Sequence, residues 1–220
     1  MDKELHKRLL NICFKNKLHH LGSYFSSVDI IDNIYKNMSE DDIFILSNGH
    51  ASVAQYVVLE KYYGIDAEKL LKDLGEHPKR DEERKIFSSS GSLGMGITVA
   101  VGRALANKSI NVHCLISDGE CAEGSVWESL KFIYENNIQN IHIYVNANGW
   151  AAYDKVDLNY LERRLTSFYP DIKFIRTSVD LYGLKGQDAH YKPFTEDQFV
   201  KAIDSLWEKS LVSFCRSKWN

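Results

Sequence analysis

The chain has 220 residues, of which 44% are hydrophobic and 26% are charged, a composition typical of a folded protein and too apolar for a disordered chain. Its 27 basic and 30 acidic residues give a net charge of −3, so no surplus of cations is present to neutralise nucleic-acid phosphates. No segment approaches the roughly 18 consecutive apolar residues of a membrane span, and the charged N-terminus lacks a signal-peptide core. We therefore expect a cytoplasmic protein that binds neither nucleic acid nor membranes.

The hydrophobic pattern predicts helices that alternate with strands. Helical spacing and capping residues predict helices over 2–17, from Ser26 or Ser27 onward, and over 50–63, 94–106, 121–136, 161–168 and 195–208. Short apolar runs predict strands over 43–46, 112–116, 141–145, 173–177 and 211–215, with loops over 74–92, 147–160 and 178–194. Strands separated by helices favour parallel crossovers. We therefore predict a three-layer α/β/α fold with a mainly parallel sheet, as one domain over residues 1–220.

Several motifs of common α/β enzymes are absent from the sequence. It contains no GxxxxGK[ST] phosphate loop, no GxGxxG dinucleotide fingerprint, no HExxH and no GxSxG. The cysteines, Cys13, Cys114, Cys121 and Cys215, form no CxxC pair, so we expect reduced thiols rather than a zinc or redox motif. These absences remove nucleotide-binding, zinc-protease and serine-hydrolase classes from first consideration.

Two neighbouring predicted strands each end in an oxygen-bearing side chain. Asp118 and Gly119 follow the strand 112–116, and Asn148 follows the strand 141–145. Ligands bind beyond the carboxyl ends of parallel strands, and a carboxylate with an amide oxygen suits Mg²⁺ or Ca²⁺. The alternative is a helix-capping aspartate and a turn asparagine, which strand-end loops also hold.

Five segments in one order resemble the transketolase family, whose members bind thiamine diphosphate. The aspartate–glycine pair at 118–119 is followed 30 residues later (148 − 118) by the asparagine–glycine pair at 148–149. The other segments are LHHLGS at 18–23, SNGH at 47–50, GEHP at 75–78 and GSLGMG at 91–96. The resemblance covers residues 5–155, with a looser match to the end. SNGH favours transketolase over the related deoxyxylulose phosphate synthases, whereas residues 18–23 lean towards that branch.

The resemblance implies a thiamine diphosphate site with Mg²⁺ or Ca²⁺. By similarity, Asp118, Asn148 and the backbone oxygen of Trp150 ligate the metal, and Asn148 also contacts the cofactor. Gly119 and His50 contact the diphosphate, and Gly91 and Leu93 border the cofactor rings. Glu123 matches an acidic residue that the family places between two active sites at a subunit interface.

Histidines are the implied proton carriers, because imidazole titrates near neutral pH. By similarity, His20 and His77 face the substrate side of the thiazolium ring, and His190 is our candidate for a late histidine of the family. Each could instead be an ordinary loop residue. His113 and His142 fall in predicted strands, and we interpret them as sheet residues. Leu21 replaces a proline of the family pattern. Trp150 is bulkier than the aliphatic residue usual in the family, so we expect a reshaped thiazolium pocket.

The chain corresponds only to the first of the three domains of a transketolase. We therefore predict the N-terminal subunit of a split enzyme, inactive alone, that pairs with a separate C-terminal subunit carrying the pyrimidine-binding domain, as α2β2. The implied reaction transfers a two-carbon ketol unit from a ketose to an aldehyde, in a specialised sugar pathway. Two alternatives stay open: a subunit of a 2-oxo acid decarboxylase, dehydrogenase or acyloin/deoxyxylulose-type synthase, and a non-catalytic scaffold.

Overall fold

The computed structural model describes residues 2–206 and 211–214. The helices are Lys3–Lys15 (α1), Leu21–Asn37 (α2), Ser52–Tyr63 (α3), Ala67–Leu74 (α4), Met95–Ala106 (α5), Gly124–Glu135 (α6), Leu158–Phe168 (α7), Gln187–Tyr191 (α8) and Glu196–Ser205 (α9). The strands are Ile43–Leu46 (β1), Val112–Ser117 (β2), Ile141–Ala147 (β3), Lys173–Val179 (β4) and Val212–Phe214 (β5). Single 3-10 turns, Gly49–Ala51 and Gly119–Ala122, follow β1 and β2.

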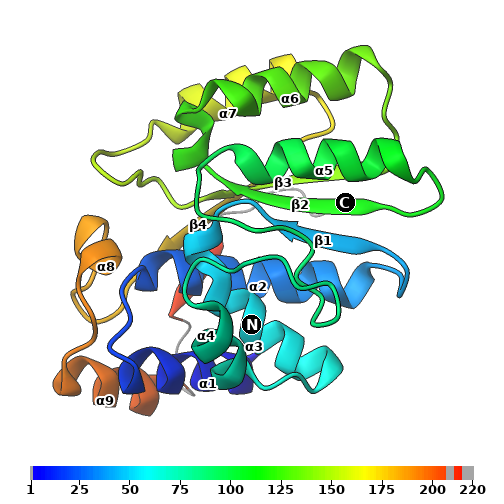
Figure 1. Cartoon of the computed structure of the whole chain (residues 1–220). Helices are drawn as coiled ribbons and strands as arrows, with labels where there is room; N and C mark the ends of the chain where they lie inside the picture. Colours follow the sequence, from blue (N-terminus) through cyan, green and yellow to red (C-terminus); the bar gives the residue numbers. More distant parts are fainter. Residues whose placement is uncertain (1, 207–210, 215–220) are drawn as a thin grey trace.

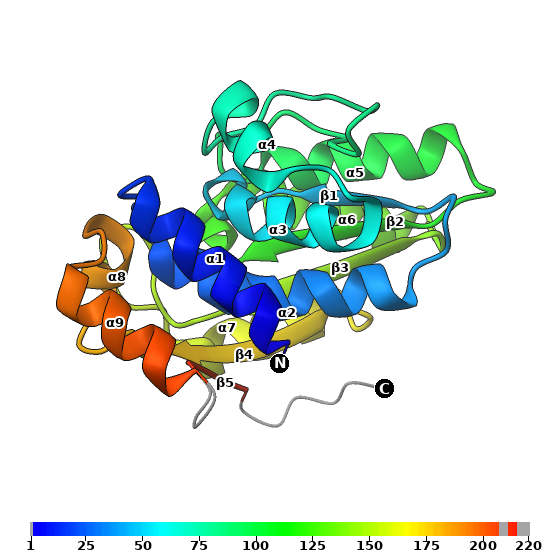
Figure 2. The same cartoon turned by 90° about the horizontal axis from the view of Figure 1, so that it is seen from below.

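The elements form three layers around one sheet, as the sequence predicted (Figure 1). The strand order is β1-β2-β3-β4-β5, with β1 to β4 parallel and β5 antiparallel to β4. Helices α5, α6 and α7 lie above the sheet in Figure 1, and α1 to α4 lie below it. Figure 2 shows α1 and α2 on the lower face, with α9 beside α1. The mainly parallel α/β/α prediction is therefore confirmed.

Alternating side chains on the strands supply both sides of the core. Ile43 and Ile45 pack in the cluster beneath α5, α6 and α7, whereas Phe44 and Leu46 pack in the cluster with α1 to α4. Because both faces are covered, all four residues of β1 are buried. This burial explains why the strands read as continuous apolar runs rather than as an alternating pattern.

Helix α2 begins earlier than the sequence prediction of Ser26 or Ser27. His20 adopts a left-handed backbone with φ 58° and ψ 23°, and α2 starts at the next residue, Leu21. Ser26 and Ser27 are buried inside the helix, where their hydroxyls accept hydrogen bonds from Asn146 instead of capping. The left-handed turn at His20 is the feature that the sequence pattern did not reveal.

Two short helices were not predicted. Helix α4 is capped by Asp66, whose side chain accepts a hydrogen bond from the Lys69 N–H at 3.0 Å. Helix α8 lies inside the predicted loop 178–194 and carries His190, and it is too short to show a helical period. The predicted ends of the last helix, at 207–208, and of the last strand, at 215, lie outside the described residues.

The structure also bears on the expectations about the cysteines and about membrane spans. Cys13, Cys114 and Cys121 are free and buried, as expected for reduced thiols, and Cys215 lies outside the described residues. Within residues 2–206 and 211–214, no helix combines the length and the apolar character needed to cross a bilayer.

Candidate functional site

A cavity of about 210 Å³ opens at the carboxyl edge of the sheet, beyond the ends of β1, β2 and β3. In Figure 1 this edge lies on the side of α8. The cavity brings together most of the predicted site residues: His20, His50, His77, Gly91, Leu93, Gly119, Asn148, Trp150 and His190. These residues come from separate loops, and the first and last of them are 170 positions apart. The fold, rather than any local sequence, therefore assembles the site.

The four histidines of the cavity form a cluster around His20. The ring centroid of His20 lies 4.4 Å from that of His190, 5.5 Å from that of His50 and 6.0 Å from that of His77. The Nδ1 atoms of His20 and His190 are 3.5 Å apart. Within the described residues, no group of three or more His, Cys, Asp or Glu side chains is arranged to hold a metal ion.

Burial keeps three of these histidines, His20, His50 and His190, neutral at physiological pH. It lowers the pKa of His50 to about 3 and that of His20 to about 4, with the neighbouring imidazoles adding to the effect. Burial also lowers the pKa of His190. A neutral imidazole carries one hydrogen-bond donor and one acceptor, so the cluster can exchange protons with hydroxyl groups.

The loop that carries His77 is tied to helices of the lower layer. Tyr24 donates a hydrogen bond to the Glu76 carboxylate at 2.6 Å, and Ser52 donates to the Glu76 carbonyl at 2.7 Å. Tyr56 donates to the Gly75 carbonyl at 2.8 Å. These bonds fix the residues before His77 while its own side chain stays exposed at the rim of the cavity.

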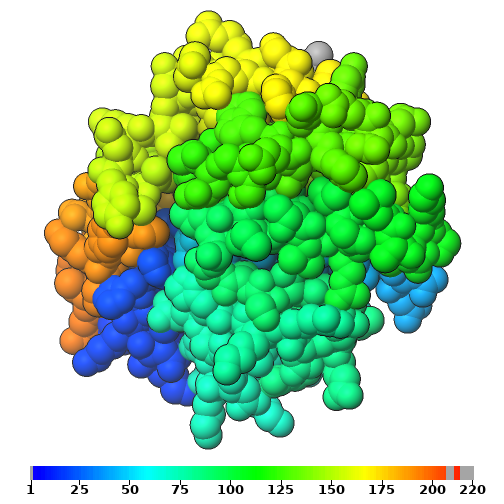
Figure 3. Space-filling view, turned by 45° about the horizontal axis from the view of Figure 1, so that its top comes forward, coloured from blue at the N-terminus to red at the C-terminus, as the bar shows by residue number. Residues whose placement is uncertain are grey.

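His190 is held by contacts between α8 and the loop after β3. The Tyr191 hydroxyl donates to the Ala152 carbonyl at 2.6 Å, and the His20 N–H donates to the His190 carbonyl at 2.9 Å. A Cβ on Gly186 would lie 2.5 Å from the Trp150 ring, so the bulky indole requires a glycine opposite it. Figure 3 shows the loop (yellow-green) against the segment of α8 (orange).

Asp118 and Asn148 present oxygen atoms at the ends of neighbouring strands. The Asp118 carboxylate accepts hydrogen bonds from the backbone N–H of Gly149 at 2.6 Å and of Gly119 at 3.0 Å. Asn148 Oδ1 accepts from the Trp150 N–H at 2.9 Å. Burial raises the pKa of Asp118 to about 7, against the opposing effect of its backbone donors. A divalent cation at this carboxylate would favour its ionised form, so the donor set fits a hard cation such as Mg²⁺.

A second buried carboxylate, Glu120, joins three loops at the cavity. Its Oε1 accepts hydrogen bonds from the Ser47 hydroxyl at 2.7 Å and from the Gly94 N–H at 2.8 Å. Its Oε2 accepts from the Ser117 N–H at 3.0 Å. Three donors favour the ionised carboxylate, although burial raises its pKa. Sequence reasoning did not single out Glu120, although it stands two residues after Asp118.

Four residues discussed in the sequence analysis do not line the cavity: Asp118, Glu123, His113 and His142. Asp118 is buried and does not line the cavity, although the next residue, Gly119, does. Glu123 does not line the cavity and is exposed at the start of α6. His113 and His142 are paired across β2 and β3, as expected for sheet residues. The cavity also contains polar residues that were not assigned from the sequence: Ser23, Asn48, Ser117 and Asn146.

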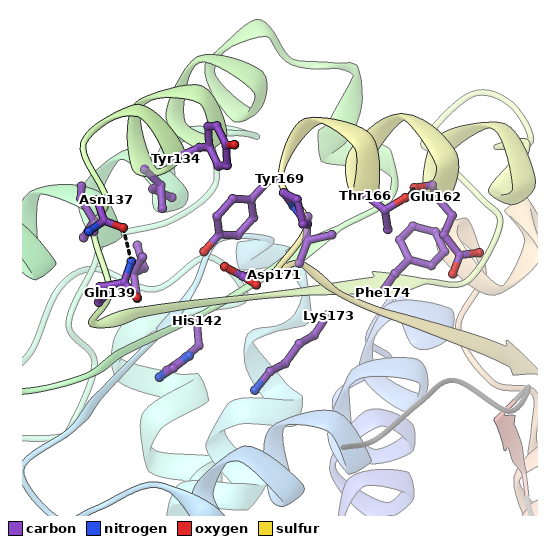
Figure 4. A pocket seen from close by; sticks show the side chains of 15 residues that line it. Tyr134, Asn137, Gln139, His142, Glu162, Thr166, Tyr169, Asp171, Lys173 and Phe174 are labelled. Carbon is purple, nitrogen blue, oxygen red and sulfur yellow. Dashed lines mark hydrogen bonds between the residues drawn. The ribbon is translucent and has the colours of Figure 1, made fainter.

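A larger cavity, of about 870 Å³, lies at the opposite edge of the sheet. In Figure 4 the side chains of His142 and Lys173 point to one side of β3 and β4, and Tyr134 and Tyr169 lie on the other. None of the predicted site residues lines this cavity.

Comparison with known proteins identifies the family. The family model for the transketolase thiamine diphosphate binding domain matches residues 22–144, which contain the SNGH, GEHP and GSLGMG segments and the Asp118–Gly119 pair. The chain belongs to the transketolase family. This finding confirms the resemblance seen in the sequence and supports thiamine diphosphate as the cofactor class and a transferase role.

Individual relatives agree with this assignment. One of the subunits of the apulose-4-phosphate transketolase of Phocaeicola vulgatus is 28% identical over 191 residues, covering 76% of this chain and 67% of the relative. The transketolase of Pongo abelii is 33% identical over 133 residues, covering 54% of this chain but only 21% of the relative. A solved transketolase from Leishmania mexicana has a TM-score of 0.67 at 16% identity, covering 93% of this chain and 41% of that chain. The chain thus spans about a fifth of the Pongo abelii transketolase.

Proposed function

We propose that the chain, as one domain over residues 1–220, is the diphosphate-binding subunit of a thiamine diphosphate- and Mg²⁺-dependent transketolase. It moves a two-carbon ketol unit from a ketose to an aldehyde. The observation that carries the proposal is the composition of the cavity. Asp118, Asn148 and Trp150 form an oxygen group that offers metal ligands, and His20, His50 and His190 offer neutral imidazoles.

The oxygen group is proposed to hold the metal and, with neighbouring residues, the diphosphate. Asp118, Asn148 and the carbonyl oxygen of Trp150 ligate Mg²⁺, and Gly119 and His50 contact the diphosphate. A Cβ on Gly119 would lie 3.3 Å from the Cα of Ala151, so the glycine keeps the backbone open at this point. Gly91 and Leu93 border the cofactor rings from the rim of the cavity. When bound, the cofactor supplies the carbon nucleophile of the reaction.

Three of the clustered histidines are proposed to bind the sugar. His20, His77 and His190 orient the substrate hydroxyls and move protons to and from their oxygen atoms. The neutral state of His20 and His190 at pH 7 supports this role, because each imidazole can accept a proton without first losing one. His77 sits most exposed of the three, which fits the entry side of the cavity.

Catalysis is proposed to require a second subunit that carries the pyrimidine-binding domain. The name of the relative from Phocaeicola vulgatus describes it as one subunit of its enzyme, which supports a split enzyme. We propose an α2β2 assembly in a specialised sugar pathway. Glu123, exposed at the start of α6, is the proposed contact between the two active sites.

Affinity purification from native cells, with mass spectrometry of the co-purifying chain, tests the partner. The proposal expects a stoichiometric partner with a pyrimidine-binding domain. The purified complex is then supplied with thiamine diphosphate, Mg²⁺ and an aldehyde acceptor, with either a ketose or pyruvate as donor. Transfer from the ketose supports the proposal. Turnover of pyruvate alone would assign the chain to a 2-oxo acid enzyme, and a complex that binds no cofactor would indicate a scaffold.

A further inference from the structure

Asn48 is a buried side chain whose two amide atoms have no partner within the described part of the chain. The residue is 0% exposed, and both Nδ2 and Oδ1 lack a hydrogen-bond partner. An unpaired buried amide destabilises the folded state. A bound ligand that forms hydrogen bonds with the amide would offset this cost. Asn48 is one of the residues that line the cavity at the carboxyl edge, where a ligand would bind.

A second asparagine of the same cavity shows the contrast. Asn146 is 1% exposed and also lines the cavity. Its Nδ2 donates to Ser26 Oγ at 2.7 Å and to Ser27 Oγ at 2.9 Å. Its Oδ1 accepts from Thr177 Oγ1 at 2.9 Å. The fold can therefore satisfy a buried amide at this edge, and it does so for Asn146 but not for Asn48.

The position of Asn48 is fixed on both sides. The preceding residue, Ser47, donates to the buried Glu120 carboxylate at 2.7 Å. The following residue, Gly49, packs so tightly that a Cβ there would lie 2.6 Å from the Cβ of Ser90. These contacts fix the turn that carries Asn48, and its carboxamide is fully buried there. The unpaired amide is thus held in place, as expected for a preorganised binding group.

We propose that Asn48 is a cofactor-binding residue whose carboxamide binds the diphosphate end of thiamine diphosphate; this inference rests on the proposed function. Asn48 follows β1, which pairs with β2, and β2 leads into Asp118 and Gly119. Asn48 is fully buried, whereas His77 and Leu93, which line the same cavity, are exposed. Nδ2 donates to an anionic phosphate oxygen. Oδ1 accepts from the water shell that Mg²⁺ usually keeps.

The first test compares the thermal stability of two variants of the full chain without cofactor. Asn48→Ala removes unpaired polar atoms, so the melting temperature is expected to stay level or to rise by about 2–4 °C. Asn146→Ala, the matched variant, leaves three hydroxyl groups without their partner, so its melting temperature is expected to fall. A fall for Asn48→Ala as large as that for Asn146→Ala would show a structural role and overturn the inference.

The second test measures the affinity for thiamine diphosphate with Mg²⁺ by calorimetry, on the full chain with its partner subunit. Asn48→Ala is expected to weaken binding about 10-fold, which corresponds to the loss of one charge-assisted hydrogen bond. Asn48→Asp places a negative charge at the same point and is expected to weaken it about 100-fold. Affinity within about twofold of the unaltered chain for both variants would overturn the inference.

Three outcomes show whether the inference about Asn48 or the proposed function has failed. If Asp118→Ala abolishes binding while Asn48→Ala does not alter it, only the role of Asn48 fails. If the unaltered complex shows no Mg²⁺-dependent binding of the cofactor, the proposed function fails and the inference fails with it. If Asn48→Asp weakens sugar binding but not cofactor binding, the carboxamide contacts the substrate instead, which also overturns the inference.

Discussion

The two edges of the sheet carry cavities of different size and different chemistry. The cavity at the carboxyl edge measures about 210 Å³, and that at the opposite edge measures about 870 Å³. Both contain histidine, and in both regions burial lowers a histidine pKa, as for His50 and His142. Volume alone would therefore favour the larger cavity as the functional site. Lowered histidine pKa values would not distinguish the two cavities.

The partners of the polar groups distinguish the two cavities. At the larger cavity, Gln139 donates to the Asn137 side chain at 2.5 Å (Figure 4). Lys173, which also lines this cavity, donates to the Tyr144 hydroxyl at 3.3 Å. At the smaller cavity, the amide of Asn48 has no partner within residues 2–206 and 211–214. The loops that follow parallel strands converge at the carboxyl edge and bring polar groups together there. Among the described residues that line the two cavities, only Asn48 has buried side-chain atoms without a hydrogen-bond partner, and this feature rather than volume marks the candidate site.

Replacing the carboxylate of the proposed metal site is expected to have the largest effect. Asp118→Ala removes the proposed protein carboxylate ligand of Mg²⁺, so the affinity for thiamine diphosphate should fall by about 100-fold or more. Calorimetry with and without Mg²⁺ measures this loss. Asp171→Ala, at the larger cavity, is the control and should bind as the unaltered chain does. Equal affinities for the two variants would remove the distinction between the edges.

A glycine at the smaller cavity should resist substitution more than one on the surface. Gly49→Ala forces a Cβ against Ser90, so we expect a loss of about 2 kcal/mol in the free energy of unfolding. The control is Gly102→Ala on α5, where no atom lies within 4 Å of the new Cβ. That change should stabilise the protein by about 0.5–1 kcal/mol, because alanine favours a helix. Urea unfolding measures both values, and a tolerated Gly49→Ala would show that the turn can relax.

The rim histidine should affect turnover more than affinity. His77→Ala removes a proposed proton-transfer group, and we expect about 10-fold slower turnover with little change in the affinity for the cofactor. His142→Ala, at the larger cavity, is the matched control and should leave both quantities unchanged. The comparison uses the assembled complex with a ketose donor. Unchanged turnover of the His77 variant would make it an ordinary loop residue.

The sequence predicted the strands and many of the cavity residues, because both depend on local patterns. The apolar runs at β1 and β2 reflect burial on both faces, and the motif around Asp118 lies where a strand must end. The family match at residues 22–144 confirms the resemblance that these motifs suggested. The roles assigned to Asp118 and His77 stay predictions, since no ligand tests them.

The features that the sequence did not reveal depend on contacts between distant residues. His20 and His190 are 170 residues apart, and their approach depends on α8, a helix too short to predict. The three hydrogen bonds of Glu120 join loops up to 73 residues apart. That Asn48 lacks a partner within the described residues follows only from the packing of all its neighbours. A motif thus identifies candidate residues, and the fold determines which of them have unmet hydrogen-bonding capacity.

Acid sensitivity is expected to show the smallest difference, because histidines near both edges have lowered pKa values. Burial lowers the pKa of His50 to about 3 and that of His113, beside the larger cavity, to about 4. Below a pH of about 6.5 these histidines bind protons in the unfolded chain but stay neutral in the folded one. The free energy of unfolding therefore falls as the pH drops towards about 4. Each histidine should contribute a loss on the order of 1 kcal/mol between about pH 7 and pH 5. Urea unfolding at the two pH values should therefore show a smaller loss of unfolding free energy for His50→Gln and for His113→Gln than for the unaltered chain. An unchanged loss for either variant would show that the histidine it replaces accepts a proton while the chain is folded.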